Sequence, residues 1–591
     1  MSSQVGARSA GDELTNLGLI AVVLLAGLAG LLRVAGTVAA LLTRTAPPGG
    51  GAEAGVRVLL HPGDPASALD APGLNRLVFW VVVGLMVVLL AVTVWVIWKL
   101  IGFLRAPIKD ARQVPGTATP REVVRIASAK AHLAKSKNLR PSLERPEPHE
   151  IGYFLGRCQG KEVWASVEDS MLLLGPPRSG KGLHIVINAI LDAPGAVITT
   201  STRPDNLTTT ITARRRVGPV AVFDPQHLAE GITAGLRWSP VRGCQSPQTA
   251  MTRAQGLASS TGLSTGGVES GGFWEGKTAA ALEQLLHAAA LGGYGARELF
   301  AWSLSPSAAA DAVAILSSHP DAAPGWSDAL ESTIHADPRT RDSVWMGVSL
   351  ALRSLADPRV MDAVSPSRGE QFDPVTFLRD NGTLYLLATS AGAGAAGPLV
   401  AAFIEDLVET AKRLAARSPG ARLDPPLLLA LDEIGNLAPI PSLPDLMSDG
   451  GGTGITPMAV LQSLAQARGK WGDQRAGTMW DAAIVKIVLG GGAVARDLQD
   501  LSALIGERDE RTDTVSVGDG GSRSVQRSTR RVPVMPPEAI RTMPFGTALT
   551  LLRAASPMIT RMRPWTARAD ADQLAAERRA VENTLRQGTD R

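Results

Sequence analysis

A short apolar run, Met171–Leu174, is followed at once by the sequence Gly-Pro-Pro-Arg-Ser-Gly-Lys-Gly at residues 175–182. Four consecutive large apolar residues predict a strand buried on both faces, and residues 184–191 predict an apolar helix. Glycines at positions 175 and 180 allow successive backbone N–H groups to point at one anion, and Lys181 adds a positive charge. The strand, the spacing and the helix together predict a phosphate-binding loop.

One position of this loop departs from the usual pattern. Gly182 stands where such loops usually carry Ser or Thr, whose hydroxyl holds magnesium. We therefore expect Ser179 or water to take the place of that hydroxyl. The residues predicted to bind the nucleotide in this loop are Gly175, Pro176, Pro177, Arg178, Ser179, Gly180, Lys181 and Gly182.

A second buried strand, Leu427–Leu431, ends in two acids, Asp432 and Glu433. In P-loop ATPases an acid at this position holds magnesium and a neighbouring group orients the attacking water. We therefore predict that Asp432 binds Mg²⁺ through water and that Glu433 is catalytic. A further strand over 454–460 leads to Gln462, whose amide is predicted to sense the γ-phosphate. The predicted catalytic residues are Lys181, Glu433 and Gln462, with ATP and Mg²⁺ as cofactors.

Composition sets limits on other chemistry. Cys158 and Cys244 are the only cysteines, which excludes a disulfide framework and a cysteine zinc site. The eight histidines are scattered, and none forms a ligand pair at helical spacing. The net charge of +4 on 591 residues argues neither for nor against a nucleic-acid partner.

Two segments near the N-terminus are membrane candidates. Leu77–Trp98 has no charged residue and is long enough to cross roughly 30 Å of hydrocarbon, with tryptophans near both ends. Leu17–Leu42 is the weaker candidate because Arg33 interrupts it, which costs a few kcal/mol unless the side chain finds a partner. A signal peptide followed by one span is the alternative, although no basic cluster or clear cleavage site supports it.

The flanking charges predict the orientation. Between Lys99 and Arg145, eleven Lys or Arg stand against three acidic residues, so the second span is expected to exit into the cytoplasm, with both termini on that side. Within this stretch, Arg121–Leu139 reads as one basic helix. It either lies on the anionic membrane surface or is a solvated linker helix, and both interpretations remain open.

The rest of the chain alternates strands and helices, which predicts a parallel α/β sheet. From about Ser246 to Ala356 the strand signals stop, and the pattern predicts four helices, over 248–259, 273–291, 297–317 and 341–356. The predicted division is a cytoplasmic tail (1–16), a first transmembrane helix (17–42), an extracytoplasmic loop (43–76), a second transmembrane helix (77–98), a basic linker (99–150), the first part of the ATPase domain (151–245), an all-helical inserted lobe (246–360), the second part of the ATPase domain (361–567) and a charged C-terminal tail (568–591).

Several basic segments have no assigned role at this stage. Arg214–Arg216 is either a solvated helix face or a DNA contact. The stretch 513–531 is either a flexible loop that touches DNA phosphates or a solvated hairpin loop. The last segment, 570–591, is expected to be a mobile helical tail.

These features resemble the TraG/TraD type of coupling ATPase of conjugative type IV secretion. The resemblance covers almost the whole chain. It rests on two N-terminal spans, the loop GPPRSGKG, the strand end VFDP, a helical lobe, the sequences LDEIGNL and LQSLAQARGKWG, and the thirty-residue interval from Asp432 to Gln462. It implies an α/β fold: a RecA-like P-loop NTPase domain with an inserted all-helical lobe, preceded by two transmembrane helices.

The resemblance also implies a function. The protein would be a homohexameric ATPase in the cytoplasmic membrane that receives a relaxase-bound single DNA strand and drives it into a type IV secretion channel. Some members carry an arginine between the Asp-Glu pair and the next strand that reaches a neighbouring subunit. Residues 447–454 of this chain contain no basic residue. Arg203, Arg468 and Arg475 are the candidates for that role.

Two other functions fit the same motifs. One is a nucleotide-gated docking receptor with little hydrolysis. The other is a double-stranded DNA pump of the chromosome-segregation kind, which usually carries a C-terminal winged helix; the segment after Trp565 is too short to hold one.

Overall fold

The computed structural model describes residues 10–49, 51, 53–104, 114–232, 235–263, 271–367, 369–370, 372–389, 396–517 and 523–588, without the side chains of 10–24, 97–104, 514–517 and 523–525. The chain divides into two compact units, Met1–Lys109 and Asp110–Arg591. Residues 1–9 of the predicted N-terminal tail lie outside the described residues.

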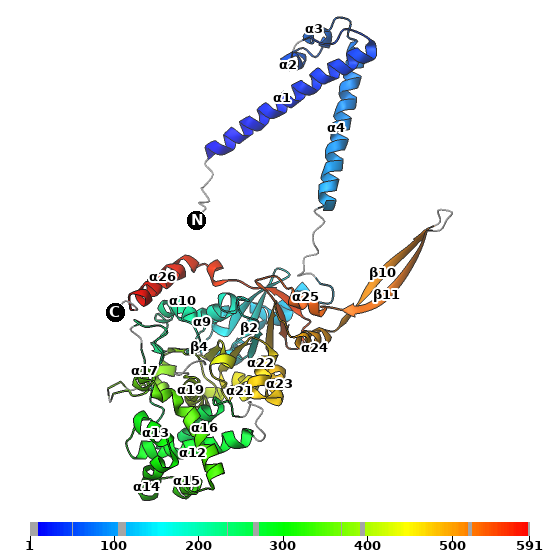
Figure 1. Ribbon diagram of the computed structural model, residues 1–591. Coiled ribbons are helices and arrows are strands. Elements are labelled where there is room, and N and C mark those ends of the chain that lie inside the picture. The colour runs from blue at the N-terminus through cyan, green and yellow to red at the C-terminus, as the bar shows by residue number, and fades with distance from the viewer. Residues whose placement is uncertain are drawn as a thin grey trace. The chain divides into compact units, whose positions relative to one another are not determined.

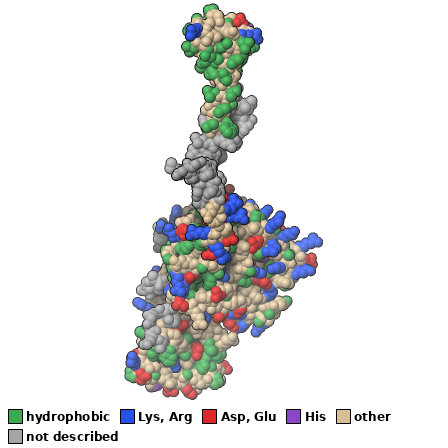
Figure 2. Space-filling model, turned by 90° about the vertical axis from the view of Figure 1, so that its right-hand side faces the viewer, with side chains coloured by type: hydrophobic (Ala, Val, Ile, Leu, Met, Phe, Trp, Pro, Cys, Tyr) green, Lys and Arg blue, Asp and Glu red, His purple; other side chains and the backbone are tan. Residues whose placement is uncertain are grey.

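The first unit consists of two long helices joined by two short ones: α1 (Ala10–Thr43), α2 (Glu53–Leu60), α3 (Pro65–Ala68) and α4 (Arg76–Leu104). Leu32, Val58, Leu69 and Phe79 form a small buried core where these helices meet. Beyond that core the described side chains of α4 are mostly apolar and exposed, as Figure 2 shows for this unit. An exposed apolar surface of this kind marks a site of contact with a membrane or another protein.

Two segments of this unit are long and apolar enough to cross a membrane, Leu25–Thr43 and Arg76–Val96. They overlap the two predicted spans, which is consistent with anchoring in a membrane. The Arg33 guanidinium, the obstacle to the first span, donates to Thr37 Oγ1 at 2.8 Å and to the Pro48 carbonyl at 2.8 Å. These partners offset part of the cost of placing the charge within an apolar helix.

The second unit begins with the basic linker, and here the prediction of one helix over 121–139 is wrong. The segment forms three short helices, α5 (Pro120–Ala127), α6 (Ala129–Leu133) and α7 (Ser136–Leu139). Ser128 is extended and accepts a hydrogen bond from the Ala131 N–H, so it ends one helix and caps the next. Val123, Ala127 and Leu139 are buried against the sheet, so the segment is neither a membrane-surface helix nor a solvated linker helix.

The centre of the unit is an eleven-stranded sheet with the order β2-β1-β13-β12-β9-β3-β8-β7-β4-β6-β5 (Figure 1). The strands from β9 to β5 run parallel, and β12, β13, β1 and β2 extend the sheet with antiparallel pairs. Its strands are β1 (Gly152–Cys158), β2 (Lys161–Ser166), β3 (Met171–Leu174), β4 (Val197–Ser201), β5 (Val220–Phe223), β6 (Thr383–Leu387), β7 (Leu427–Leu431), β8 (Ile455–Leu461), β9 (Val485–Leu489), β12 (Thr547–Leu552) and β13 (Met558–Arg561).

The segment before the phosphate loop forms a hairpin of β1 and β2. β9 begins at Val485, after α23 ends at Ala482. The strand β13 had no sequence prediction. The helices around the sheet are α8 (Pro148–Ile151), α9 (Ile187–Asp192), α10 (Asp205–Arg214), α18 (Pro374–Arg379), α19 (Gly397–Ala416), α20 (Ile434–Leu437), α21 (Leu443–Asp449), α22 (Leu464–Trp471), α23 (Asp473–Ala482), α24 (Ala495–Ile505), α25 (Pro537–Arg541) and α26 (Ala571–Gly588).

Between β5 and β6 the chain is helical, as predicted. The helices are α11 (Pro247–Ser259), α12 (Gly271–Leu291), α13 (Ala296–Ser303), α14 (Ala310–Ser318), α15 (Trp326–Ile334), α16 (Pro338–Leu352) and α17 (Pro358–Ala363). The single helix predicted over 297–317 is interrupted, because Ser305 and Pro306 start a new turn there. Trp302 and Trp345 are buried, and the apolar core of these helices is continuous with that on one side of the sheet.

Two C-terminal features differ in their packing. Strands β10 (Glu507–Val517) and β11 (Arg523–Pro533) pair as a two-stranded ribbon that projects from the body of this unit (Figure 1), in agreement with the solvated-hairpin interpretation. The helix predicted over 570–591 is confirmed over the described residues as α26, but it is packed against the body of this unit and is not a mobile tail. It packs on α10 through Leu574, Val581 and Leu585, with an ion pair between Arg216 and Glu577 at 2.7 Å.

Arg214 fits neither interpretation of the arginine triplet, whereas Arg215 and Arg216 are exposed, as a solvated helix face requires. The Arg214 side chain is buried, with 1% of its surface exposed. It donates to Thr383 Oγ1 at 2.8 Å, to the Ala193 carbonyl at 2.8 Å and to the Gly195 carbonyl at 2.6 Å. The side chain therefore ties the loop between α9 and β4 to the start of β6.

We expect Arg214→Leu to lower the free energy of unfolding by about 3 kcal/mol, because it leaves two carbonyls and one hydroxyl buried without a donor. The matched change Arg215→Leu, at an exposed neighbour, should cost less than about 0.5 kcal/mol. Urea unfolding of the detergent-solubilised chain, followed by tryptophan fluorescence, measures both. Equal effects would contradict the structural role of Arg214.

Candidate nucleotide site

The order of the parallel strands determines which loops meet. Strands β3, β8, β7 and β4 are neighbours in that order, and ligands bind outside the carboxyl ends of such strands. The loop 175–182 follows β3, Gln462 follows β8, Asp432 and Glu433 follow β7, and α10 follows β4. Segments that are up to 290 residues apart in sequence therefore meet at one edge of the sheet.

The loop after β3 curls as the glycine pattern predicts. Gly180 has a φ of 88°, which favours glycine, and Gly182–Val186 form a π-helical turn before α9. The Lys181 ammonium is buried and donates to the carbonyls of Gly175 at 2.7 Å and Pro176 at 3.2 Å. It also lies 3.8 Å from Glu433 Oε1. The positive charge is thus held inside the loop and beside the acidic pair.

Asp432 is the most strongly perturbed acid of the site. Burial raises the pKa of its carboxyl to about 6, and the Glu433 charge adds to this, whereas the hydrogen bond from Asn206 and the Lys181 charge oppose it. Asn206 Nδ2 donates to Asp432 Oδ2 at 3.2 Å, and Thr200 Oγ1 donates to the Asp432 carbonyl at 2.7 Å. Asp432 Oδ1 is buried and has no hydrogen-bond partner among the described residues. A cation is the partner that such an oxygen lacks.

Glu433 is held by a ring of amides. Its backbone is left-handed, with φ at 54°, and its Oε2 accepts from Gln462 Nε2 at 3.1 Å and from Asn436 Nδ2 at 2.5 Å. Gln466 closes the ring by donating to Asn436 Oδ1 at 2.6 Å and accepting from the Gln462 N–H at 2.8 Å. Hydrogen bonds therefore link the carboxylate at the tip of β7 to the amide at the tip of β8.

The structure brings Lys181, Glu433, Gln462 and Asp432 together, and it leaves other predicted groups outside this set. The Ser179 hydroxyl donates to the Pro176 carbonyl at 2.8 Å. Pro177 and Arg178 are exposed on the outer side of the loop. The three arginine candidates do not contact the acidic pair: Arg203 pairs with Asp205 at 3.5 Å, Arg468 pairs with Asp497 at 2.7 Å, and Arg475 donates to the Pro441 carbonyl at 2.9 Å.

Sequence reasoning missed four polar residues that complete the site: Thr200, Asn206, Asn436 and Gln466. Asn206 lies on α10, three residues beyond the candidate Arg203. Asn436 and Gln466 lie three and four residues beyond Glu433 and Gln462. Helical spacing places such residues on the same side of a turn, so this signal was available.

No cluster of three or more His, Cys, Asp or Glu side chains suited to a metal occurs among the described residues. Asp432 with its unpartnered oxygen, beside the predicted phosphate loop, fits a magnesium ion that takes its remaining ligands from phosphates and water.

Comparisons with known proteins agree with this architecture. Two family models match the chain: "Type IV secretory system Conjugative DNA transfer" over residues 126–293 and "TraM recognition site of TraD and TraG" over residues 426–545. The first match contains the phosphate loop, and the second begins at β7 and includes Asp432, Glu433 and Gln462. No curated protein matches the sequence.

Solved structures share the fold. The bacterial conjugative coupling protein TrwBdeltaN70, in its unbound monoclinic form, matches at 18% identity with a TM-score of 0.52, over 72% of this chain and 91% of that chain. Its trigonal form in complex with sulphate matches at 18% identity with a TM-score of 0.50, over 74% of this chain and 93% of that chain. At this identity the likeness shows a common fold.

The sheet, the loop and the acidic strand end define the class as a RecA-like P-loop protein of the α/β type. Within that class, the two matched segments in this order on this fold support the family predicted from the motifs. The two family matches support a coupling protein of the TraG/TraD type.

Proposed function

We propose that this protein is a membrane-anchored ATPase that couples a relaxase-bound single DNA strand to a type IV secretion channel. The observation that carries the proposal is the meeting of Lys181, Asp432, Glu433 and Gln462 at the ends of β3, β7 and β8. In this set Lys181 supplies a positive charge for phosphates, Asp432 a carboxylate for magnesium and Glu433 a carboxylate for the attacking water. The fourth residue, Gln462, links the end of β8 to Glu433 at the end of β7.

Each residue has a separate task in the proposed hydrolysis of ATP. Lys181 exchanges its two loop carbonyls for phosphate oxygens and neutralises their charge. Glu433, oriented by Gln462 and Asn436, positions the attacking water and accepts its proton. Asp432 holds Mg²⁺, which when bound neutralises charge on the transferred phosphoryl group. The remaining loop residues, from Gly175 to Gly182, surround the phosphates with backbone N–H groups.

Localisation in the cytoplasmic membrane, with both termini and the ATPase part on the cytoplasmic side, is supported by the two apolar helices and the basic segment after the second. We also keep the predicted division of the chain, in which the helices between β5 and β6 form a lobe that meets the DNA-processing complex.

We infer a homohexamer as the active form. Among the described residues of one chain, Lys181 is the positive side chain that lies beside the acidic pair. The side chains of Arg203 and Arg475 are 76% and 49% accessible, so they are available to a neighbouring subunit. An arginine supplied by a neighbour raises hydrolysis rates by about 10³ to 10⁵ in related ATPases. A ring brings such a residue to every site and forms a channel for the DNA strand.

The function is tested by ATP turnover of the full chain in lipid nanodiscs, with and without single-stranded DNA. We expect Lys181→Ala to weaken nucleotide binding by about 10-fold or more, because a charge-assisted contact is lost. Glu433→Gln should bind nucleotide normally and lower turnover by about 10² or more. Lys161→Ala, at an exposed lysine, is the control.

The outcomes separate the three candidate functions. Stimulation by single-stranded DNA supports the coupling ATPase. Turnover that ignores DNA supports a docking receptor, and stimulation by double-stranded DNA alone supports a duplex pump. Equal turnover in Glu433→Gln and the wild type would remove the catalytic role of Glu433.

The shared site is tested by mixing inactive variants. Lys181→Ala subunits keep their arginines, and Arg203→Ala or Arg475→Ala subunits keep their phosphate loops, so mixtures should recover part of the turnover at mixed interfaces. Turnover per subunit that stays constant down to monomeric concentrations, measured with mass photometry in parallel, would contradict a shared site.

A further inference from the structure

The loop glycine Gly182 leaves the proposed magnesium site without the hydroxyl that such loops usually supply. Ser179, the nearest loop hydroxyl in sequence, donates instead to the Pro176 carbonyl. The metal that accompanies the proposed ATP function therefore needs another protein oxygen besides Asp432.

Asn206 places an amide oxygen at this position. It is the second residue of α10 and is buried, with 3% of its surface exposed. Asn206 Nδ2 donates to Asp432 Oδ2, so the amide oxygen Oδ1 of Asn206 faces away from that carboxylate. A Cβ added to Gly182 would have Asn206 Oδ1 as its nearest non-bonded neighbour, at 3.6 Å. The amide oxygen of Asn206 thus lies beside the place where the Cβ of a serine at position 182 would be.

We propose that Asn206 Oδ1 replaces the missing loop hydroxyl in the magnesium site, next to Asp432. This inference rests on the proposed function. An uncharged amide oxygen is a suitable ligand for Mg²⁺ or for its bound water. The hydrogen bond from Asn206 Nδ2 to Asp432 Oδ2 already joins the two side chains before an ion binds.

The test is the magnesium dependence of nucleotide binding by the full chain, followed by calorimetry with ADP and by electron paramagnetic resonance with Mn²⁺. We expect Asn206→Ala to raise the half-saturating concentration of the metal by about 10- to 100-fold. ADP binding in EDTA should remain within about twofold of the wild type. Asn206→Asp keeps an oxygen and should retain metal binding.

A compensating change makes the test specific. Only Asn206 Oδ1 lies within 4 Å of a Cβ at Gly182, so a side chain fits there. In the Asn206→Ala background, Gly182→Ser should restore metal binding and Gly182→Ala should not. An unchanged metal requirement in Asn206→Ala, or an equal loss of ADP binding in EDTA, overturns the inference. Absence of ADP binding in the wild type overturns the proposed function itself.

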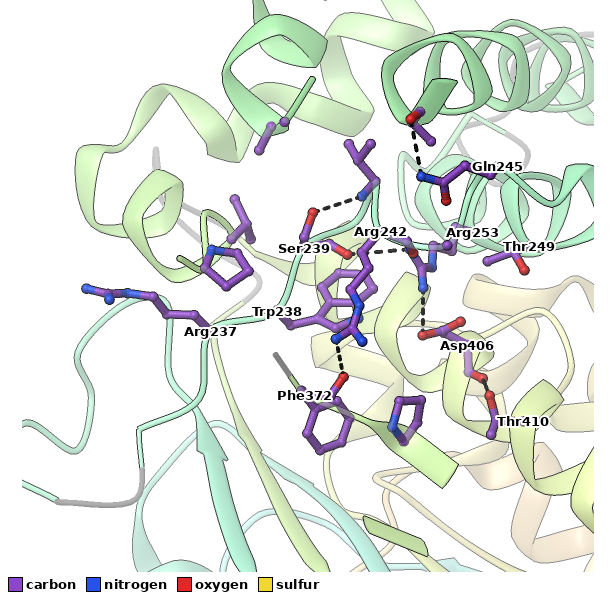
Figure 3. A pocket seen from close by; sticks show the side chains of 18 of the residues that line it. Arg237, Trp238, Ser239, Arg242, Gln245, Thr249, Arg253, Phe372, Asp406 and Thr410 are labelled. Atoms are coloured by element: carbon purple, nitrogen blue, oxygen red, sulfur yellow. Dashed lines mark hydrogen bonds and ion pairs between the residues drawn. The ribbon is translucent and has the colours of Figure 1, made fainter. Parts of the chain in front are cut away.

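A separate observation concerns a cavity of about 710 Å³ between the helices after β5 and the sheet (Figure 3). Its walls come from the segment 237–253, the start of α13, the segment 364–379 and the second half of α19. Seven of its lining residues are arginines and two are acids: Arg237, Arg242, Arg253, Arg297, Arg379, Arg413, Arg417, Glu298 and Asp406.

Three of these arginines are neutralised within the protein. Arg253 pairs with Asp406 at 2.9 Å, both buried, as Figure 3 shows. Arg237 pairs with Asp362 and Glu370, and Arg413 lies 3.9 Å from Glu409. Arg297, Arg379 and Arg417 are exposed and have no ion-pair partner among the described residues.

A second cavity shows that this excess is not a general property of an arginine-rich chain. It measures about 970 Å³ and is lined by five arginines. Arg140 pairs with Asp424, Arg157 with Glu162, and Arg563 and Arg568 with Asp192. Four of the five arginines in the second cavity therefore form an ion pair with a carboxylate. In the first cavity, Arg297, Arg379 and Arg417 form no such pair with a described residue.

We infer that the first cavity binds phosphate groups of single-stranded DNA. Guanidinium groups suit phosphates, and the Tyr294 ring, 46% exposed at the same cavity, offers a face on which a base can stack. Because Arg297 lies on α13 and Arg379 and Arg417 lie on or next to α18 and α19, a bound strand would bridge the inserted helices and the sheet.

The test is the binding of a fluorescent oligothymidylate to the full chain over a range of salt concentrations. The triple change of Arg297, Arg379 and Arg417 to Gln should weaken binding at least about 10-fold. It should also reduce the slope of log K against log salt by about 2, since each phosphate contact contributes about 0.7. ADP binding should remain unchanged.

The matched control changes Arg215, Arg496 and Arg579 to Gln; these are exposed and lie outside the cavity. An equal loss in this control, or an unchanged slope in the cavity variant, overturns the assignment. Binding of polyglutamate is measured in parallel. If the cavity variant loses polyglutamate binding but keeps DNA binding, the assignment to DNA is overturned in favour of an acidic protein segment.

Discussion

The site depends on the parallel pairing of four neighbouring strands. Leu174 at the end of β3 pairs with Leu461 at the end of β8, and Leu431 at the end of β7 pairs with Ala459 and Thr200. Because these strands are parallel and their carboxyl ends lie close to one another, the loops that follow them open at one edge of the sheet. A slip of one residue in any pair would turn the strand's side chains to the opposite face and separate the loops.

Burial at this edge sets the electrostatics of the site. Asp432, Glu433 and Lys181 lie together where few waters screen their charges, and the raised pKa of Asp432 records the cost. The amides of Asn206 and Asn436 donate to the two carboxylates, and Gln466 in turn donates to Asn436. A site with this preorganisation gains most from a cation and a polyphosphate, whose charges complete it.

The same sheet connects the site to the rest of the molecule. The helices between β5 and β6 share a continuous core with one face of the sheet, through residues such as Phe223, Trp238 and Phe403. α19 lines the arginine cavity and leads through its C-terminus to β7, which carries Asp432 and Glu433. A ligand in the cavity therefore contacts the elements that support the acidic pair.

The sequence by itself determined the class of fold, the phosphate loop, the acidic pair, Gln462 and the two apolar helices, because these signals are local: apolar runs, glycine spacing and adjacent charges. It did not determine where polar side chains from distant segments meet. Asn206, Asn436 and Gln466 were missed, Arg214 is buried, the segment 121–139 is three helices and α26 is packed. Their environment depends on the order and register of the strands and on helix contacts, which only the tertiary structure decides.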